Sequence, residues 1–247
     1  MDDRVVIVTG AGRGLGRGAA LAFASEGCRV AVLEWDPVTG ADTAAEIEKR
    51  GTQSLAVACD VGDKAAVDAA VASVVERFGR VDVVINNAQA VTFTTVLETS
   101  DDDADVMWRS GFLGTLHVMQ AAHPHLLATQ GNIINVISGA MLGGFGKSGV
   151  YGSVKAAIRT LTRAAAIEWG PQGIRVNCIS PSAQTPALEQ WKKDFPEAYA
   201  QRTSIIPLQR FGDPEDDIGR ALVALASANA HYITSATVTV DGGAYFL

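Results

Sequence analysis

The sequence predicts a doubly wound α/β fold, in which one mostly parallel seven-stranded sheet carries helices on both faces. Short apolar runs rich in valine and isoleucine alternate with longer segments of helical periodicity. Continuous apolar runs are typical of strands buried on both faces, as in parallel sheets. Strand–helix alternation with right-handed crossovers then gives an open, doubly wound sheet. No linker or change in composition divides the 247 residues, so we expect one domain over residues 1–247.

The elements follow one another in a regular order. The expected strands are residues 4–9, 29–33, 54–59, 81–85, 132–137, 175–179 and 236–240. The expected helices are residues 15–25, 37–50, 64–78, 103–128, 150–169 and 214–226, and glycines follow the first three. The acidic run 101–103 favours the beginning of the fourth helix. Residues 181–212 carry four prolines and break the alternation, which predicts a substrate lid or binding loop within the domain.

Composition excludes several classes of function. The net charge of −7 and the absence of a basic cluster argue against nucleic acid as a partner. The three cysteines form no CxxC pair, and the four histidines lack ligand spacing, so we expect neither a disulfide framework nor a metal site. No signal peptide or membrane-spanning run is evident, so we expect a cytoplasmic protein without a membrane partner.

A glycine-rich turn stands between the first strand and the first helix. It comprises Gly10, Gly12, Arg13, Gly14, Leu15 and Gly16. Glycines let the backbone approach a diphosphate closely, and the helix N-terminus adds free N–H groups and a positive dipole end. Placed inside a strand–turn–helix unit, the turn predicts the phosphate site of a dinucleotide.

Two acidic residues are expected to bind the adenosine of such a cofactor. Glu34 ends the second strand, where a carboxylate accepts hydrogen bonds from both ribose hydroxyls and repels a 2′-phosphate. This favours NAD, although Arg13 beside the turn could hold that phosphate and leaves NADP possible. Asp60 follows the third strand and is placed to accept from the adenine amino group, or to cap the next turn instead.

The catalytic candidates are Ser138, Tyr151 and Lys155. Tyr151 and Lys155 are four residues apart on one predicted helix, so they share a face. A neighbouring ammonium favours phenolate and lowers the pKa of tyrosine from its usual value of about 10. Ser138 lies at the carboxyl end of the fifth strand, where open α/β sheets bind ligands. Tyr151 can then serve as a general acid or base beside a substrate oxygen that Ser138 holds.

Motifs in a fixed order span nearly the whole chain. They are residues 9–16, Asp60-Val61, Asn86-Asn87-Ala88, Ser138, Tyr151 to Lys155, Arg175-Val176-Asn177 and Asp241-Gly242-Gly243. On these motifs the chain resembles the short-chain dehydrogenases/reductases. The resemblance implies hydride transfer between a nicotinamide dinucleotide and a secondary alcohol or ketone.

The same resemblance implies roles for particular residues. Tyr151 would be the acid/base, Lys155 would lower its pKa and bind the nicotinamide ribose, and Ser138 would position the substrate. Further cofactor contacts are implied for Val61, Asn87, Ala88, Pro181 and Ala183. Members of the family are commonly dimers or tetramers, so a homodimer or homotetramer is expected. The apolar residues 244–247 are candidates for packing against a neighbouring subunit.

Three positions depart from the family pattern. Gly111 replaces an asparagine thought to hold a water between the lysine and solvent, a role that Ser110 could take if the helix is irregular. Gln89 replaces a glycine, and its amide could reach the ribose or the substrate. Ser182 replaces another glycine beside Pro181, in a loop that contacts the nicotinamide carboxamide. These changes leave open an alternative, a cofactor-binding protein with impaired or lost turnover that acts through interaction.

The expected substrate pocket is mostly apolar. Its wall is predicted to include Gln89, Ala140, Met141, Leu142, Phe145, Thr185, Leu188 and Trp191. Such a lining favours a hydrophobic alcohol or ketone over a sugar or an acid. Phe145 and Trp191 have an equally good interpretation as core residues.

Overall fold

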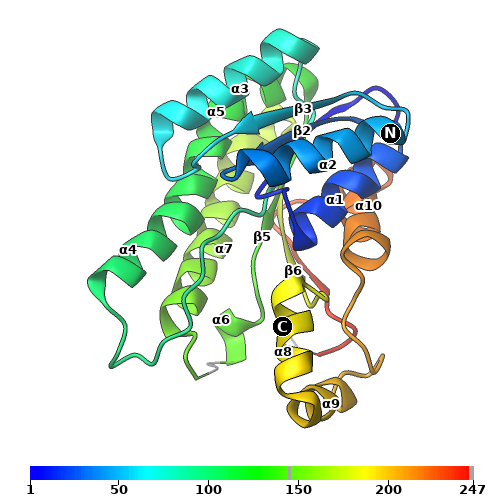
Figure 1. Cartoon of the computed structure of the whole chain (residues 1–247). Coiled ribbons are helices and arrows are strands. Elements are labelled where there is room, and N and C mark those ends of the chain that lie inside the picture. The colour runs from blue at the N-terminus through cyan, green and yellow to red at the C-terminus, as the bar shows by residue number, and fades with distance from the viewer. Residues whose placement is uncertain (144–145, 245–247) are drawn as a thin grey trace.

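A computed structural model describes residues 1–143 and 146–244 of the chain (Figure 1). Within these residues seven strands pair in parallel as one sheet, in the order β3-β2-β1-β4-β5-β6-β7. The strands are β1 (Val5–Thr9), β2 (Arg29–Glu34), β3 (Ser54–Ala58), β4 (Val83–Asn86), β5 (Asn132–Val136), β6 (Arg175–Pro181) and β7 (Thr237–Val240). The predicted fold class is confirmed.

Helices cover both faces of the sheet (Figure 1). The helices of the described residues are α1 (Gly14–Ser25), α2 (Pro37–Lys49), α3 (Lys64–Phe78), α4 (Asp101–Trp108), α5 (Gly114–Thr129), α6 (Ala140–Gly143), α7 (Gly149–Trp169), α8 (Pro186–Asp194), α9 (Pro196–Ser204) and α10 (Arg220–Ala226), of which α6, α8 and α9 lie at the end of the sheet rather than on its faces. Short irregular turns are η1 (Arg109–Leu113), η2 (Gly170–Gln172), η3 (Pro214–Gly219) and η4 (Ala228–Ala230).

Two apolar layers hold these helices on the sheet. On one face Val71 of α3, Met119 of α5 and Ala165 of α7 belong to one buried cluster. On the other face Phe23 of α1 and Leu222 of α10 belong to a second. The inner strands β1, β2, β4, β5 and β6 contribute side chains to both layers, which is why apolar residues follow one another along them rather than alternate.

The helix expected over residues 103–128 is in fact interrupted. The structure has α4, a π-turn η1 and α5, with Gly111 in the middle of η1. Glycine lowers helix propensity and leaves no side chain to pack against the preceding turn, which eases a wider turn here. The helix begins two residues earlier than expected, because Ser100 caps it and Asp101 to Asp103 form its first turn. The helix expected over residues 214–226 is likewise divided, into the π-turn η3 and α10, and α6 was not expected.

The carboxyl ends of the strands converge on one end of the molecule. Strand β5 runs toward α6 and β6 runs toward α8 and α9, at the lower end of Figure 1. Strand β1 pairs with both β2 and β4, so the chain reverses its winding direction there. Open α/β sheets bind ligands in the crevice at such a switch point.

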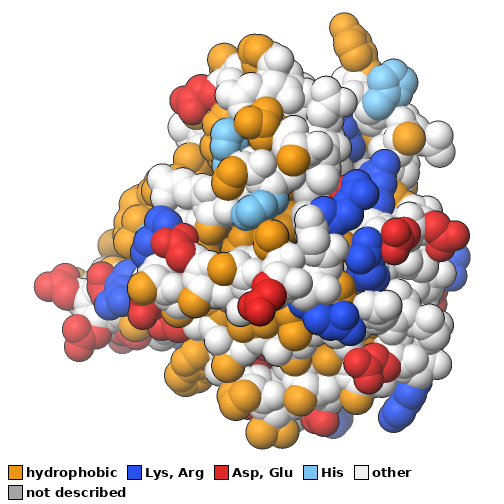
Figure 2. All heavy atoms as spheres, turned by 90° about the horizontal axis from the view of Figure 1, so that it is seen from above, with side chains coloured by type: hydrophobic (Ala, Val, Ile, Leu, Met, Phe, Trp, Pro, Cys, Tyr) orange, Lys and Arg blue, Asp and Glu red, His pale blue; other side chains and the backbone are white. Residues whose placement is uncertain are grey.

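Charged side chains of both signs lie on the surface of the protein. On the face seen in Figure 2, acidic and basic side chains are interspersed, and no field of one sign covers it. Within residues 1–143 and 146–244, no helix is long and apolar enough to cross a membrane. The same residues contain no group of three metal-ligating side chains. All three cysteines are buried and free.

Candidate active site

The turn between β1 and α1 is packed backbone against backbone. Gly10 and Gly14 have φ of +61° and +55°, a region that favours glycine. A Cβ on Gly16 would lie 2.2 Å from the carbonyl oxygen of Gly10, so no larger residue fits. Arg13, at the N-cap of α1, makes no side-chain capping bond, whereas Asp36 caps α2. The first N–H groups of α1 are thus left for an anion, and this arrangement fits a dinucleotide diphosphate.

Glu34 lies against this turn. One carboxylate oxygen accepts a hydrogen bond from the Gly12 N–H at 2.7 Å, and the other accepts from the Trp35 N–H at 3.0 Å. The second oxygen also accepts from the Asp36 N–H at 3.4 Å, so the oxygen bonded to Gly12 is the one that retains a lone pair for a ribose hydroxyl. Arg13 and Trp35 are both exposed.

Asp60 and Val61 follow β3 at the same edge of the sheet. Asp60 is exposed, and one of its carboxylate oxygens accepts from the Gly62 N–H at 2.8 Å. The side chain therefore caps the turn that follows it, which was the alternative to binding the adenine amino group. Val61 is buried, and its carbonyl oxygen lies 3.0 Å from Nδ1 of His117 in α5. No spacing in the sequence indicated that His117 would contact this loop.

The loop after β4 fastens the glycine-rich turn. Nδ2 of Asn87 donates to the carbonyl oxygens of Thr9 and Gly10, both at 3.0 Å. The N–H of Ala88 donates to Oγ1 of Thr9 at 3.0 Å. Asn87 and Ala88 therefore stand directly beside the predicted phosphate site.

Ser138, Tyr151 and Lys155 come together at the carboxyl end of β5. The Tyr151 phenol and the Ser138 hydroxyl are hydrogen-bonded to each other. Nζ of Lys155 lies 5.7 Å from the centre of the Tyr151 ring and donates to the Val136 carbonyl oxygen at 2.8 Å. The Lys155 side chain is almost fully buried, with 3% of the residue exposed.

Burial decides the protonation of this pair. It raises the pKa of Tyr151 above 10.0, and the hydrogen bond with Ser138 opposes the rise. It also lowers the pKa of Lys155 to about 8, because a charged ammonium is costly away from water. The expected acidification of the phenol is therefore not seen in this structure. The reason is that desolvation of the phenol is the largest cause of the shift, and the Ser138 hydroxyl offsets it only in part.

The predicted substrate wall is only partly assembled around Tyr151. Met141 packs in the cluster that holds Tyr151, and the Ala140 N–H donates to Oγ of Ser138 at 3.2 Å. Thr185 caps α8 by accepting from the Leu188 N–H at 3.3 Å. The Trp191 ring lies 6.0 Å from that of Tyr199, and both residues belong to the segment 181–212. Phe145 and the side chain of Leu142 lie outside the described residues, as do residues 245–247.

One aromatic neighbour was missed by sequence reasoning. Phe93 meets the Tyr151 ring edge to face, with centroids 6.3 Å apart, and is 65% exposed. Phe112 and Val150 pack in the same cluster. Phe93 belongs to a loop without regular structure, and no motif or periodicity marks it.

The loop that follows β6 is tied to Gly212 and to the end of β7. Ala183 forms a parallel bridge with Gly212, and the N–H of Ser182 donates to the Val240 carbonyl oxygen at 3.0 Å. Pro181 pairs with Val240 at the end of β6. Serine in place of glycine at 182 is therefore accommodated in an ordinary sheet-like loop.

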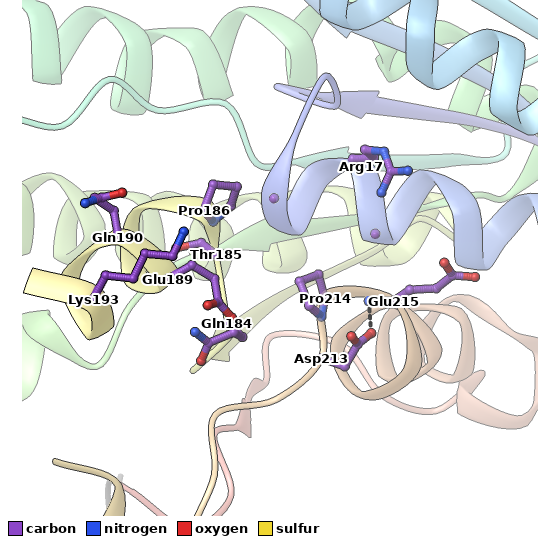
Figure 3. A pocket seen from close by; sticks show the side chains of 12 residues that line it. Arg17, Gln184, Thr185, Pro186, Glu189, Gln190, Lys193, Asp213, Pro214 and Glu215 are labelled. Carbon is purple, nitrogen blue, oxygen red and sulfur yellow. Dashed lines mark hydrogen bonds between the residues drawn. The ribbon is translucent and has the colours of Figure 1, made fainter. Parts of the chain in front are cut away.

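A cavity of about 510 Å³ opens beside the glycine-rich turn, between α1, α8 and η3 (Figure 3). Gly14 and Arg17 line one side, and Thr185, Pro186 and Glu189 line the other. Arg17 is ion-paired with Glu46. None of Ser138, Tyr151 and Lys155 lines this cavity, so it extends the phosphate end of the site rather than the catalytic end.

The chain matches known proteins over nearly its whole length. Residues 10–245 match the family model described as enoyl-(acyl carrier protein) reductase. The chain is 40% identical to the 12alpha-hydroxysteroid dehydrogenase of Clostridium sp. (strain ATCC 29733 / VPI C48-50), over 98% of this chain and 96% of the relative. The chain belongs to the short-chain dehydrogenase/reductase family. As a member of that family it is an oxidoreductase whose relatives act on alcohols and ketones with nicotinamide cofactors.

Two further relatives of this short-chain dehydrogenase/reductase differ in the substrates that their names state. Meso-2,3-butanediol dehydrogenase of Serratia marcescens is 36% identical, over 98% of this chain and 95% of the relative. The solved structure of an NAD⁺-bound xylitol dehydrogenase superposes with a TM-score of 0.91 at 29% identity, covering 98% of this chain and 99% of that one. Fold and chemistry are thus shared across the family while the substrate varies.

Proposed function

We propose that this short-chain dehydrogenase/reductase transfers hydride between NAD and a secondary alcohol or ketone, with Tyr151 as the general acid/base. The observation that carries the proposal is the hydrogen bond between Tyr151 and Ser138 at the carboxyl end of β5, with the buried Lys155 beneath the ring. Bound nicotinamide would accept or supply the hydride.

The chain's own groups perform the proton transfer. In alcohol oxidation the Tyr151 phenolate takes the hydroxyl proton, and in ketone reduction the phenol returns it. Ser138 donates to or accepts from the same substrate oxygen and fixes its position. Lys155 stabilises the phenolate and binds the nicotinamide ribose. The raised pKa of Tyr151 suits the acid direction, because the phenol stays protonated until it is needed.

NAD is the proposed cofactor because of Glu34. Its carboxylate is fixed beside the turn by the Gly12 N–H, where it accepts from ribose hydroxyls and repels a 2′-phosphate. Arg13 is exposed and makes no capping bond, so NADP is the weaker alternative.

The substrate is proposed to be hydrophobic. Phe93, Phe112, Met141 and Val150 surround Tyr151 with apolar surface. The segment 181–212, with α8 and α9, is proposed to act as the lid over this surface. Exposed apolar side chains on Val106, Leu127 and Ile167 support the proposal of a homodimer or homotetramer.

The test measures reduced nicotinamide absorbance with a panel of secondary alcohols and ketones, including a hydroxysteroid and a vicinal diol. Tyr151→Phe should lower kcat by about a hundredfold or more while cofactor affinity changes little. Tyr232→Phe is the matched control, since Tyr232 is 95% exposed and should change nothing.

The competing function is a cofactor-binding protein that acts through interaction. It would give NADH binding by calorimetry without turnover on any substrate, and Tyr151→Phe would then have no kinetic effect. That result would overturn the proposed enzyme activity.

A further inference from the structure

The loop between β4 and α4 carries its apolar side chains on the outside. Val91, Phe93, Val96 and Leu97 are 40%, 65%, 83% and 95% exposed. The threonines of the same loop, at 92, 94, 95 and 99, are half-buried instead. Single exposed apolar residues are common on protein surfaces, but a group of them is typical of a binding surface. We call residues 91–97 the apolar loop.

Hydrogen bonds among the threonines stabilise this inverted arrangement. Oγ1 of Thr99 donates to the Thr95 carbonyl oxygen at 2.8 Å and lies 2.8 Å from Oγ1 of Thr94. Oγ1 of Thr95 donates to a carboxylate oxygen of Glu98 at 2.6 Å. Turning the loop over to bury its apolar side chains would break these bonds. The exposure of the apolar side chains is therefore built into the loop.

The segment that contains the apolar loop is anchored at both ends on α4 and η1. Nε2 of Gln89 donates to a carbonyl oxygen of α4 at 2.9 Å, and Oγ of Ser110 accepts from the Ala90 N–H at 3.0 Å. A Cβ on Gly111 would overlap Oε1 of Gln89, so the glycine in η1 leaves room for this amide. At the other end Ser100 caps α4. The loop thus begins and ends at fixed points.

The apolar loop lies against the beginning of α7 (Figure 1). The ring of Phe93 meets the Tyr151 ring edge to face, with centroids 6.3 Å apart. Cγ2 of Val96 lies 3.1 Å from the position that a Cβ on Gly149 would take, and Gly149 is the first residue of α7. The exposed apolar surface therefore begins at the proposed acid/base and continues along the loop.

The charges around the apolar loop limit what it can bind. Glu98 follows the loop directly, and the acidic run 101–103 comes next in the chain. Lys147 acts on Glu98 and offsets one of these four negative charges. An anionic lipid surface attracts basic segments, so this acidic surrounding opposes it, and it opposes an acidic substrate as well. An uncharged apolar molecule meets no such repulsion.

We propose that the apolar loop selects the substrate by size, and that it binds the non-reacting part of a large, uncharged, apolar secondary alcohol or ketone. Phe93 contacts the substrate next to the carbon that reacts, and Leu97 contacts its far end. This inference rests on the proposed function. A large apolar substrate removes these side chains from water, whereas a small alcohol leaves most of them exposed, so burial of apolar surface favours the large one.

The test compares a short and a long alcohol on the same variants. The probes are cyclohexanol and 4-cyclohexylcyclohexanol, which differ by a second ring and not in charge. Leu97→Ala should raise the KM for the long probe about fivefold and leave the KM for cyclohexanol unchanged. Phe93→Ala should raise both KM values, by about tenfold or more for the long probe, and Phe93→Leu should give a smaller rise.

The same variants should change kcat little, because they remove contacts that the ground state and the transition state share. Ile233→Ala is the matched control for Leu97→Ala. Ile233 is 41% exposed and precedes β7, at the end of the sheet opposite the site, so neither KM should change. The inference is overturned if Phe93→Ala and Leu97→Ala both retain the wild-type KM for 4-cyclohexylcyclohexanol.

Sedimentation velocity tests a second copy of the chain as the occupant of the apolar loop. Wild-type protein, Phe93→Ala and Leu97→Ala should sediment as the same species, because the inference reserves the loop for the substrate. If Leu97→Ala dissociates an oligomer and leaves the KM for both probes unchanged, the loop is an interface between subunits and the inference is overturned.

Binding of a dye separates this inference from the proposed function. N-phenyl-1-naphthylamine, an uncharged apolar dye, should fluoresce on the wild-type protein and be displaced by 4-cyclohexylcyclohexanol, and Phe93→Ala should weaken both effects. If the wild-type protein transfers no hydride to any alcohol, the proposed function fails, but displacement of the dye is still expected. Hydride transfer without displacement would overturn the role of the apolar loop and leave the proposed function intact.

Discussion

The turn after β1 and the lid after β6 border the same cavity, yet they are held in place in different ways (Figure 3). In the turn, backbone meets backbone, and an added methyl on Gly16 would overlap the Gly10 carbonyl group. In the lid, no residue of α8 or α9 is buried, and capping bonds and ring contacts between side chains hold the helices. Substitutions are therefore expected to disturb the turn far more than the proposed lid.

The largest effect is expected in the turn. Gly16→Ala should abolish measurable NADH binding, a loss of about a hundredfold or more, because a backbone carbonyl group cannot move aside as a flexible side chain can. Calorimetric titration with NADH measures it. Gly170→Ala is the control, since an added Cβ there has no neighbour within 4 Å and the backbone is helical. Normal affinity in Gly16→Ala would show that the turn is not close-packed.

The buried lysine beneath Tyr151 should make stability depend on pH. Burial lowers the pKa of folded Lys155 to about 8, while the unfolded chain titrates near 10.5. Between these values the unfolded state binds more protons, so stability rises with pH; below about pH 8 the full penalty applies. Lys155→Met should therefore raise the free energy of unfolding by about 3 kcal/mol at pH 7 and by less at pH 9.

Urea unfolding of both proteins at the two pH values measures this difference. Lys49→Met, at the exposed end of α2, should show no such dependence on pH. The raised pKa values of the buried thiols of Cys28 and Cys59 are common to all three proteins and cancel in the comparison. A variant less stable than wild type at pH 7 would mean that Lys155 is not penalised by burial.

The same contrast, between structure set by the backbone and structure set by side-chain contacts, explains which features could be predicted from the sequence. The parallel sheet, the turn at 10–16 and the position of Glu34 at the end of a strand depend on local pattern and on backbone sterics, so they could be predicted. The association of Ser138 with Tyr151 could be predicted too, because both follow elements at one edge of the sheet. The contact of Gln89 with Gly111 could not, since it depends on a π-turn that no periodicity signals.

The pKa shifts at the site could not be predicted from the sequence either. Helical spacing places Lys155 near Tyr151, but it does not say how deeply either is buried. Burial reverses the direction of the pKa shift expected for Tyr151. Phe93 was missed for a related reason, because its loop position carries no pattern and only the folded chain brings it to the Tyr151 ring.

A smaller effect is expected at the adenosine end of the turn. Glu34→Ala removes the acceptor of the Gly12 N–H and the proposed partner of the ribose hydroxyls. NADH should bind about tenfold more weakly, and NADPH should be affected less, because the repulsion of its 2′-phosphate is removed as well. Parallel titrations with the two cofactors measure the ratio, with Glu26→Ala at the exposed end of α1 as the control. If the ratio of NADH affinity to NADPH affinity did not change, Arg13 rather than Glu34 would determine the preference for one cofactor.

The smallest effects compare one cap in each region. Asp63 caps α3 by accepting from the Ala65 and Ala66 N–H groups, and Thr185 caps α8 by accepting from the Leu188 N–H. Replacing either by alanine should remove about 1 kcal/mol of capping free energy. Helix α3 is anchored in the core through buried side chains such as Val71, so Asp63→Ala should lower the free energy of global unfolding.

Helix α8 has no buried residue, so the same loss should appear there as local opening. Thr185→Ala should speed hydrogen exchange of the α8 amides about fivefold and leave the urea midpoint within error of the wild type. Ser204→Ala, at the end of α9, is the control for a lid hydroxyl that caps no helix N-terminus. If Thr185→Ala lowered the midpoint as much as Asp63→Ala does, the lid would unfold with the sheet.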